Sequence, residues 1–173
     1  MDLDKVIRKV PDFPKPGVLF YDVTGIFTNP HAFRFVISKM LSLYEAEKID
    51  GVIAIEARGF VLGSFFALER ELPLILARKK GKLPGKTIAE SYALEYGEAT
   101  LEMHIDDLQP NKHYLIIDDL IATGGTIEAV AKMVGRRGAI VAGVFGIIGL
   151  PFLNYGERIG KLNPRTLIDY EGE

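Results

Sequence analysis

Two adjacent carboxylates followed by a glycine-rich loop are the residues best suited to chemistry. In the stretch IIDDLIATGGT (residues 116–126), Asp118 and Asp119 end an apolar run, and the segment TGGT follows four residues after Asp119. Consecutive glycines let backbone N–H groups converge, and the N-terminus of the helix predicted to follow favours anions. The loop fits either a phosphate site or a tight turn with a capping threonine, and the glycines alone do not separate these.

The acid pair favours the phosphate site, because carboxylates accept hydrogen bonds from the hydroxyls of a sugar phosphate. Paired carboxylates also suit a ligand that carries magnesium, and they favour a sugar whose C1 becomes cationic during reaction. A ribose 5-phosphate would place its hydroxyls on Asp118 and Asp119 and its phosphate in the loop.

An alternative is the acid pair of a P-loop nucleoside triphosphatase. That class needs the loop G-x-x-x-x-G-K-[ST]. The nearest match, GKLPGKT at residues 81–87, is one residue short and contains Pro84. Gly97 interrupts the stretch in which a helix should follow, so the sequence disfavours this class.

Basic residues near predicted strand ends could contact further phosphates. Arg58 lies in EARGF, where its guanidinium could hold a phosphate by two hydrogen bonds. The alternative for Arg58 is a surface salt bridge with Glu56 or Glu69. The run RKKGK (residues 78–82) could contact a pyrophosphate, or it could be a solvated loop.

Buried strands alternating with helices must position these groups. The apolar runs 51–55, 72–78 and 113–117 predict strands, and another strand is expected from Ile140. Helices are predicted from Pro30 to about residue 47, over GFVLGSFFALEREL and from Ile127 onward. This alternation predicts an α/β fold with a parallel sheet, whose ligands lie at the carboxyl ends of the strands.

Other segments give weaker signals. A short helix is expected at residues 3–10, an irregular or extended segment at 11–22, an exposed strand over ATLEMHI and a short strand at TLIDY. Residues 79–98 show no sustained period, so we expect a long loop with little contribution to the core.

The bulk composition limits the class of protein. The 173 residues suit one domain, the net charge of -2 gives no general attraction for nucleic acid, and the absence of cysteine excludes disulfides and thiolate metal sites. The uncharged stretch 138–156 contains six glycine or proline residues, so a buried strand and loop is favoured over a membrane span. We expect a cytoplasmic protein.

The segment YLIIDDLIATGGT resembles the signature of the type I phosphoribosyltransferases. PDFPKPGVLFYDVTGIF, EARGF and RKKGKLPGKTIAESYALEYGEATLE resemble the adenine phosphoribosyltransferase branch of that family, and the likeness covers nearly the whole chain. The resemblance implies one domain over residues 1–173: a central, mostly parallel sheet flanked by helices, a small base-binding hood from about residues 1–30, and a mobile loop.

The resemblance also implies roles for individual residues. Asp118 and Asp119 would hold the ribose hydroxyls, and Glu95 would be the acid/base partner of the adenine N7. The other implied substrate-binding residues are Ala122, Thr123, Gly124, Gly125 and Thr126 for the 5-phosphate, Arg58, Lys79 and Lys82 for pyrophosphate, Tyr96 on the mobile loop, and Leu19 and Tyr21 for the base.

The implied reaction joins adenine to 5-phospho-α-D-ribose 1-diphosphate, giving AMP and diphosphate. Mg²⁺ would be held mainly by diphosphate, ribose hydroxyls and water, and a homodimer is implied. Two positions depart from the family: Tyr21 stands where arginine is common, and Gly149 stands where many relatives have an acidic residue. A transferase for a 6-oxopurine, or a regulator that binds the ribosyl diphosphate without turnover, remain alternatives.

Overall fold

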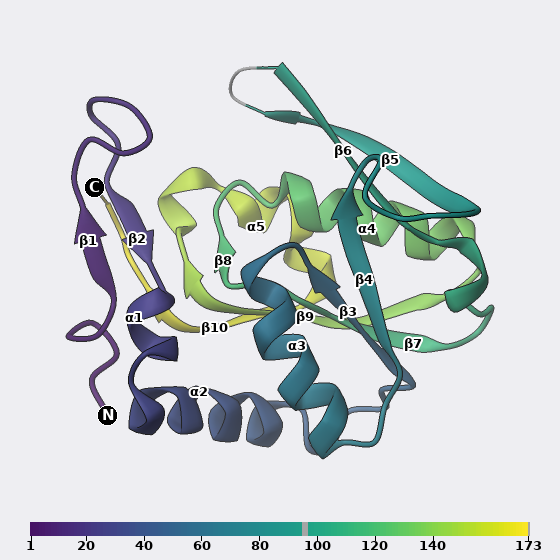
Figure 1. The fold of residues 1–173 in the computed structure, drawn as a ribbon, viewed down its shortest axis with the longest axis horizontal. Coiled ribbons are helices and arrows are strands. Elements are labelled where there is room, and N and C mark those ends of the chain that lie inside the picture. The colour runs from purple at the N-terminus through teal and green to yellow at the C-terminus, as the bar shows by residue number, and fades with distance from the viewer. Residues whose placement is uncertain (95–96, 173) are drawn as a thin grey trace.

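The apolar runs of the sequence form the strands of one central sheet. The computed structural model describes residues 1–94 and 97–172. The sheet contains β3 (Gly51–Ile55), β4 (Leu74–Lys79), β5 (Thr87–Leu94), β6 (Gly97–His104), β7 (His113–Ile117), β8 (Leu120–Ile121), β9 (Ile140–Gly149) and β10 (Pro164–Asp169). The strand order is β10-β9-β7-β3-β4-β6-β5, and β8 pairs with β9 (Figure 1).

The central strands run parallel, as the alternation of strands and helices predicted. β3 pairs in parallel with both β4 and β7, and β9 pairs in parallel with β7 and β10. In the described part of this sheet, the antiparallel pairs are β4 with β6 and β5 with β6. The carboxyl ends of β3, β4, β7 and β9 therefore meet at one edge, here called the carboxyl edge, and their beginnings meet at the opposite amino edge.

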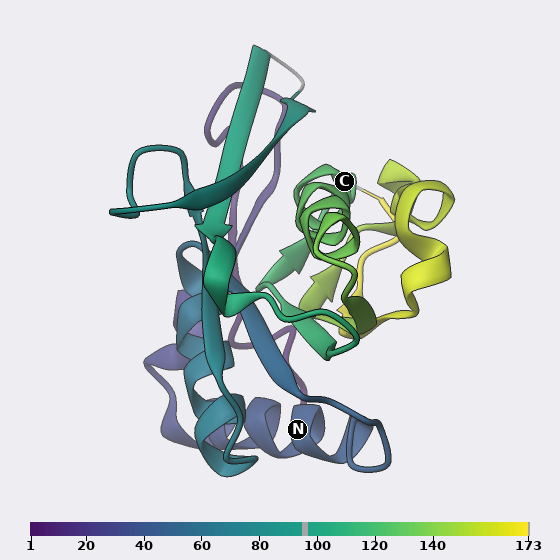
Figure 2. The same ribbon diagram turned by 90° about the vertical axis from the view of Figure 1, so that its right-hand side faces the viewer.

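Helices cover both faces of this sheet. They are α1 (Thr24–Phe27), α2 (Pro30–Leu43), α3 (Arg58–Glu69), α4 (Gly125–Arg136) and α5 (Tyr155–Ile159). Single 3-10 turns lie at Ile105–Asp107, Pro151–Leu153 and Gly160–Leu162. Figure 2 shows α2 and α3 on one side of the sheet and α4 and α5 on the other. Each side has its own buried cluster, since Phe66 and Met40 pack with Leu115 on the first side and Val130 packs with Ile116 on the second.

The predicted start of α2 is confirmed. Asn29 lies just before Pro30, and its side chain accepts hydrogen bonds from the backbone N–H groups of His31 and Ala32, both at 3.1 Å. Such a cap satisfies donors that the first helical turn leaves without partners. The helix ends at Leu43, several residues before the predicted end.

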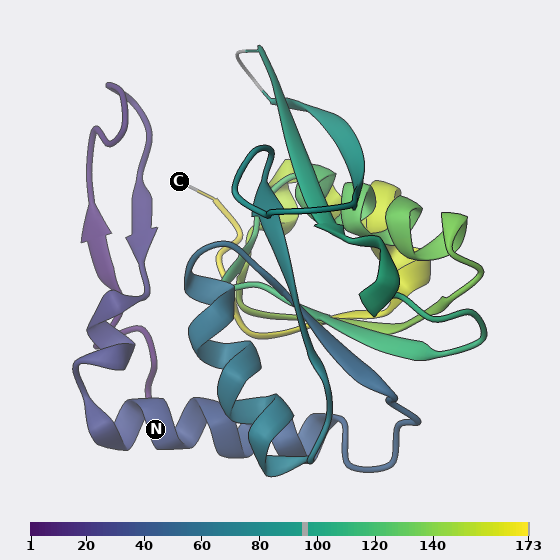
Figure 3. The ribbon, with the colours of Figure 1, turned by 45° about the vertical axis from the view of Figure 1, so that its right-hand side comes forward.

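The helix predicted at residues 3–10 is wrong. One helical turn forms, in which the Ile7 N–H donates to the Leu3 carbonyl at 3.1 Å, and the chain then enters β1 (Arg8–Val10). β1 pairs antiparallel with β2 (Phe20–Asp22) in a separate two-stranded sheet, which stands apart from the main sheet in Figure 3. The apolar spacing of Leu3 and Ile7 is satisfied by this one turn, and pairing with β2 then holds residues 8–10 in an extended conformation.

The long loop expected over residues 79–98 is largely wrong as well. β5 and β6 form a hairpin that is paired from Thr87 opposite His104 to Leu94 opposite Gly97. Ile88 and Tyr92 alternate toward the core, but Glu90 lies between them and forms an ion pair with Arg136 of α4 at 3.2 Å. Because Glu90 points inward, the sequence of β5 does not show the alternation of apolar and polar residues that predicts a strand.

The strand predicted at ATLEMHI is confirmed within β6, although two of its residues belong to the core. Leu101 and Met103 are buried rather than exposed. In the described part of the chain, no helix is long and apolar enough to cross a lipid bilayer.

Candidate active site

The acid pair lies at the carboxyl edge, directly after the central strand β7. The Asp118 N–H donates to the Phe145 carbonyl of β9 at 3.0 Å, which extends the parallel pairing to the acid pair. Asp119 is only 5% exposed, and its Oδ2 accepts a hydrogen bond from Arg58 Nε at 2.6 Å. The structure thus brings together three residues that the sequence predicted for one site.

Gly59 makes this meeting of α3 and β7 possible. A Cβ at this position would lie 2.7 Å from the Ile117 carbonyl oxygen and 3.3 Å from the Asp118 Cα. Both neighbours are backbone atoms that cannot rotate away, so a larger residue would push α3 off the strand end. The glycine of EARGF is therefore needed so that Arg58 can reach Asp119.

The protein does not stabilise the two carboxylates of the site to the same extent. Burial raises the pKa of Asp118 well above its ordinary value, and the adjacent Asp119 carboxylate raises it further. Arg58 opposes this shift, but its hydrogen bond goes to Asp119. Asp118 is therefore a carboxylate whose charge would be stabilised by a ligand that donates hydrogen bonds.

The loop after β8 has the geometry expected of an anion site. Gly124 has a φ of +77° and precedes α4, which begins at Gly125. Within the described residues, no protein group accepts a hydrogen bond from the backbone N–H groups of residues 123–126. These donors lie at the N-terminus of a 12-residue helix, where the helix dipole favours an anion.

Helix α5 covers the other side of this loop. A Cβ on Gly124 would lie 3.2 Å from Ile159 and 3.4 Å from Tyr155, so the loop has packing on one side and solvent beside Thr123 on the other. The loop shape is thereby fixed by the protein before any anion binds.

The basic segment after β4 is ordered by two carboxylates, Glu56 and Glu102, whose contacts with it the sequence did not predict. Glu56 Oε2 accepts from Arg78 Nε and from the Lys79 N–H, both at 3.1 Å. Glu102 of β6 is 5% exposed and accepts from the Lys82 N–H at 3.0 Å and the Leu83 N–H at 2.9 Å.

These backbone contacts leave the side chains of Lys79 and Lys82 at the surface. The salt bridge considered for Arg58 with Glu56 is absent from the described ion pairs, since Glu56 pairs with Arg78. The Glu56–Ala57 peptide bond is cis.

The two residues predicted for the base differ in their placement. Leu19 is half-buried, whereas Tyr21 is 4% exposed and its ring stacks on Tyr170 with centroids 4.1 Å apart. Phe20 lies near Arg58, whose guanidinium is 5.7 Å from the Phe20 ring centroid. Side chains alternate along a strand, so Phe20 and its neighbour Tyr21 face opposite sides of β2. This alternation is the sequence signal that could have indicated Phe20 as a residue facing the site.

Glu95 and Tyr96 lie outside the described residues. Among the residues that are described, no group of three or more His, Asp or Glu side chains is arranged to hold a metal ion.

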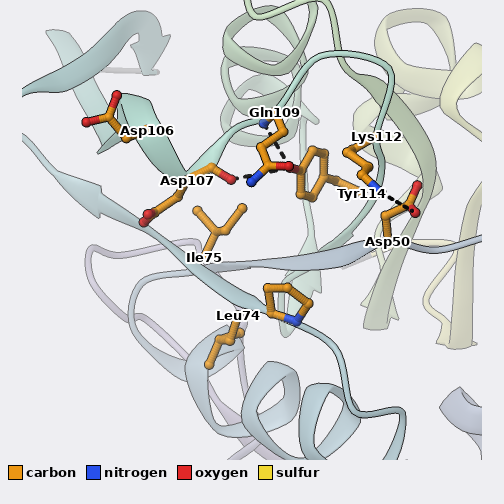
Figure 4. Close-up of a pocket in the computed structure, with 9 residues that line it drawn as sticks. Asp50, Leu74, Ile75, Asp106, Asp107, Gln109, Lys112 and Tyr114 are labelled. Atoms are coloured by element: carbon orange, nitrogen blue, oxygen red, sulfur yellow. Dashed lines mark hydrogen bonds and ion pairs between the residues drawn. The ribbon is translucent and has the colours of Figure 1, made fainter.

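A separate pocket of about 400 Å³ lies at the amino edge. It is lined by Asp50, Pro73, Leu74, Ile75, Asp106, Asp107, Gln109, Lys112 and Tyr114 (Figure 4). The Tyr114 hydroxyl accepts from the Gln109 N–H at 3.0 Å, and Lys112 Nζ donates to Asp50 at 3.2 Å. Asp50, Lys112 and Tyr114 in the lining of this pocket are thus hydrogen-bonded within the protein.

The chain is similar to proteins of known family over almost its full length. A family model for the phosphoribosyl transferase domain matches residues 22–148. An adenine phosphoribosyltransferase from Treponema denticola is 52% identical over 171 residues, which span 99% of this chain and 90% of that protein.

Solved structures give the same result. The crystal structure of adenine phosphoribosyltransferase from Thermoanaerobacter pseudethanolicus has a TM-score of 0.94 at 38% identity, covering 97% of this chain and 98% of that one. The enzyme from Trypanosoma brucei, solved in complex with AMP, pyrophosphate and ribose-5-phosphate, has a TM-score of 0.88 at 29% identity. The likeness covers 96% of this chain and 77% of that chain.

Proposed function

The chain belongs to the adenine phosphoribosyltransferase family, and we propose that it transfers the 5-phosphoribosyl group of 5-phospho-α-D-ribose 1-diphosphate to adenine. The products are AMP and diphosphate, so the enzyme salvages the free base. The observation that carries the proposal is the acid pair Asp118–Asp119 beside a helix N-terminus whose loop N–H groups have no protein acceptor among the described residues. Residues 1–173 form one phosphoribosyltransferase domain in this proposal.

The two halves of the site suit the two ends of the donor sugar. The 5-phosphate binds the N–H groups of residues 122–126, and the hydroxyls of Thr123 and Thr126 add donors. The ribose 2- and 3-hydroxyls donate to Asp118 and Asp119. These bonds favour the ionised form of Asp118, whose pKa is raised by burial in the free protein.

The acid pair also favours the reacting state. The bond between C1 and the diphosphate oxygen breaks, C1 gains positive charge, and a ring nitrogen of adenine forms the new bond from the opposite face. A carboxylate pair near C1 stabilises this charge without forming a covalent intermediate.

Cations stabilise the leaving diphosphate. Arg58 lies at the acid pair, and Lys79 and Lys82 extend from the segment held by Glu56 and Glu102. Oxygen ligands are those that Mg²⁺ prefers, and the ion, when bound through diphosphate, ribose hydroxyls and water, neutralises the diphosphate charge.

The hood and the β5–β6 hairpin supply the base site. Phe20 and Leu19 contribute apolar surface to the base, and Phe20 lies next to Arg58 and hence near the ribose. Glu95 is the acid/base partner of the adenine N7, and its carboxylate accepts the proton that adenine loses as the ring nitrogen bonds to C1. Tyr96 belongs to the same closing segment. Glu95→Gln should lower kcat strongly while the donor Kd stays near that of the wild type, because the donor contacts lie elsewhere.

A homodimer is the assembly that fits the surface of α3. Val61, Phe65 and Leu68 are 37%, 43% and 73% exposed, and their spacing places them on one face of the helix. Light scattering should give a dimer mass. The same measurement on a Phe65→Glu, Leu68→Glu variant should give a monomer if this face is the interface.

A purine panel tests the activity. The protein is assayed with labelled donor and adenine, guanine, hypoxanthine or xanthine, with and without Mg²⁺. Adenine should be preferred by a wide margin, because a site that hydrogen-bonds a 6-amino group leaves polar groups unpaired when a 6-oxo group enters. Comparable turnover of a 6-oxopurine would assign a different base. Donor binding without turnover of any purine would make the protein a regulator.

A further inference from the structure

The β1–β2 part of the N-terminal hood, residues 8–22, is held to the domain by contacts with the C-terminal tail, residues 170–172. β1 and β2 share no strand pairing with the main sheet over the described residues. The tail follows β10 and lies beside the hood in Figure 1, and in Figure 3 the C-terminus lies between the hood and the rest of the domain. Whatever fixes the hood must therefore act through side chains and the tail.

Tyr170 is the centre of these contacts. Its ring is stacked on Tyr21 with an interplanar angle of 16°, and its hydroxyl donates to Asp4 Oδ1 at 2.6 Å. Lys9 of β1 forms an ion pair with Asp4 at 2.7 Å and places its ammonium 5.2 Å from the Tyr170 ring centroid. The Tyr21 hydroxyl lies 3.5 Å from the Gly172 carbonyl, at the limit of a hydrogen bond.

The other end of this connection is rigid. The Tyr170 N–H donates to the Gly149 carbonyl at 3.0 Å, and the preceding Asp169 pairs with Gly149 in the main sheet. A Cβ on Gly149 would lie 2.2 Å from Asp169 Oδ1, so the glycine leaves room for the Asp169 side chain. Tyr170 is thus fixed to the sheet by its backbone and to the hood by its ring and hydroxyl.

The contact between Tyr170 and Tyr21 also sets the position of Phe20. It is the neighbour of Tyr21 in β2, so the two side chains point to opposite faces of the strand. With Tyr21 held against Tyr170, the Phe20 ring is directed toward Arg58, which is hydrogen-bonded to Asp119. A loose hood would leave the distance between Phe20 and the acid pair undetermined.

We propose that Tyr170 and Tyr21 are positioning residues that clamp the hood over the acceptor site and so determine affinity for the purine. The clamp rests on the proposed function, since it assigns the base to the Phe20 side of the hood. It also gives Tyr21 a role that does not involve contact between its side chain and the base.

Steady-state kinetics of full-length variants test the clamp. Tyr170→Ala removes the stack and the Asp4 hydrogen bond, and the KM for adenine should rise by roughly 3- to 10-fold. The KM for the donor should stay within about twofold, because the proposed donor contacts lie outside the hood, at the acid pair, the loop before α4 and the cations Arg58, Lys79 and Lys82. Tyr170→Phe keeps the ring and should recover most of the adenine affinity. Tyr21→Leu should behave like Tyr170→Ala.

Tyr114→Phe is the matched control. It also removes a hydroxyl that is hydrogen-bonded to a neighbouring segment, but at the amino edge. Both KM values should stay at the wild-type level, whatever happens to the thermal stability of this variant. A general loss of stability therefore would not imitate the expected split between the two substrates.

Hydrogen exchange over residues 8–22 gives a second readout if Tyr170→Ala fails to fold. Tyr170→Phe loses only the Asp4 hydrogen bond, so exchange there should speed up slightly in this variant, and more strongly in Tyr21→Leu, which loses the stack, while exchange in α4 is unchanged. A wild-type enzyme that does not use adenine would overturn the proposed function. An active wild type whose clamp variants keep the adenine KM and the hood protection, or raise both KM values equally, would overturn the clamp alone.

Discussion

The two edges of the central sheet both carry aspartate and a basic partner, yet they treat charge in opposite ways. At the amino edge, Asp50 accepts from the His113 N–H at 2.9 Å, from His113 Nδ1 at 3.1 Å and from Lys112 Nζ at 3.2 Å. The His113 backbone hydrogen bond is the main cause that lowers the pKa of Asp50 to about 2. At the carboxyl edge, burial and the neighbouring Asp119 raise the pKa of Asp118.

This difference distinguishes groups that stabilise the fold from groups that are suited to bind a ligand. The amino edge also has the pocket of about 400 Å³, but Asp50, Lys112 and Tyr114 in its lining are hydrogen-bonded within the protein. The carboxyl edge has a carboxylate in an unfavourable environment beside N–H groups that find no acceptor in the described chain. Unsatisfied polar groups at strand ends, rather than the size of a cavity, mark the site in this molecule.

The largest effect should come from neutralising the acid pair. Asp118→Asn and Asp119→Asn each remove one charged hydrogen-bond acceptor, worth about 1.5–3 kcal/mol. Donor kcat/KM should fall roughly 10- to 150-fold in each variant while circular dichroism stays native. Asp106→Asn, which changes an exposed acid at the amino edge, is the control and should keep full activity. Wild-type kinetics in both Asp118→Asn and Asp119→Asn would show that these carboxylates do not bind the ribose hydroxyls.

A smaller effect should follow from displacing α3 without changing a charge. Gly59→Ala places a methyl group 2.7 Å from the Ile117 carbonyl, and such overpacking costs about 1–3 kcal/mol of unfolding free energy. Donor kcat/KM should fall too, because Arg58 moves away from Asp119. Gly156→Ala in α5 meets no atom within 4 Å and should leave both quantities unchanged or slightly improve stability. Equal behaviour of the two variants would show that the α3 contact is dispensable.

Much of the carboxyl edge was predictable because its residues are close in sequence or follow recognisable strands. Asp118, Asp119 and the loop at residues 122–126 form one continuous segment, and Arg58 follows an apolar run that is typical of a buried strand. The rule that parallel strands end at the same edge then brings them together. The family resemblance was also recognisable from the sequence, because each of its motifs is a continuous segment of the chain.

Features that depend on contacts between distant segments were not predictable in this way. Glu90 interrupts the apolar alternation of β5, and only the position of Arg136 on α4 explains its inward direction. The sequence identified the hood but not its orientation, which depends on Tyr170 at the other end of the chain stacking on Tyr21. Glu102 orders the segment carrying Lys82 from a different strand, and no local pattern indicates this.

Neutralising Asp118 should raise the stability of the folded protein, although it lowers the activity. The folded-state pKa of Asp118 is raised, so the folded protein binds the proton more tightly than the unfolded chain, and stability falls as pH rises above the unfolded value of about 4. Asp118→Asn keeps an acceptor for the Asp119 N–H and removes the charge. Near neutral pH it should gain on the order of 1 kcal/mol, or about 2–4 °C in Tm.

Calorimetry of the ligand-free protein between pH 4 and pH 8 measures this gain. The difference in Tm between Asp118→Asn and wild type should be small at pH 4 and grow with pH. Asp119→Asn provides the contrast, because it loses the ion pair with Arg58 and should be destabilised. A destabilised Asp118→Asn at pH 8 would mean that the carboxylate is stabilised by the fold and that the two edges do not differ.

The smallest effect should come from the amino edge. The folded-state pKa of Asp50 is lowered to about 2, so its ionised form stabilises the fold fully above the unfolded value of about 4. That contribution is lost as pH falls through about 2, since the carboxyl is then protonated in both states. Asp50→Asn should therefore be less stable than wild type in urea at pH 5–7, and the two should converge as the pH is lowered toward 2. Both KM values and kcat should match wild type, because His113 and Lys112 begin the strand that the acid pair ends. A kinetic defect in Asp50→Asn as large as that of the acid-pair variants would contradict the division of the sheet into a structural edge and a reactive edge.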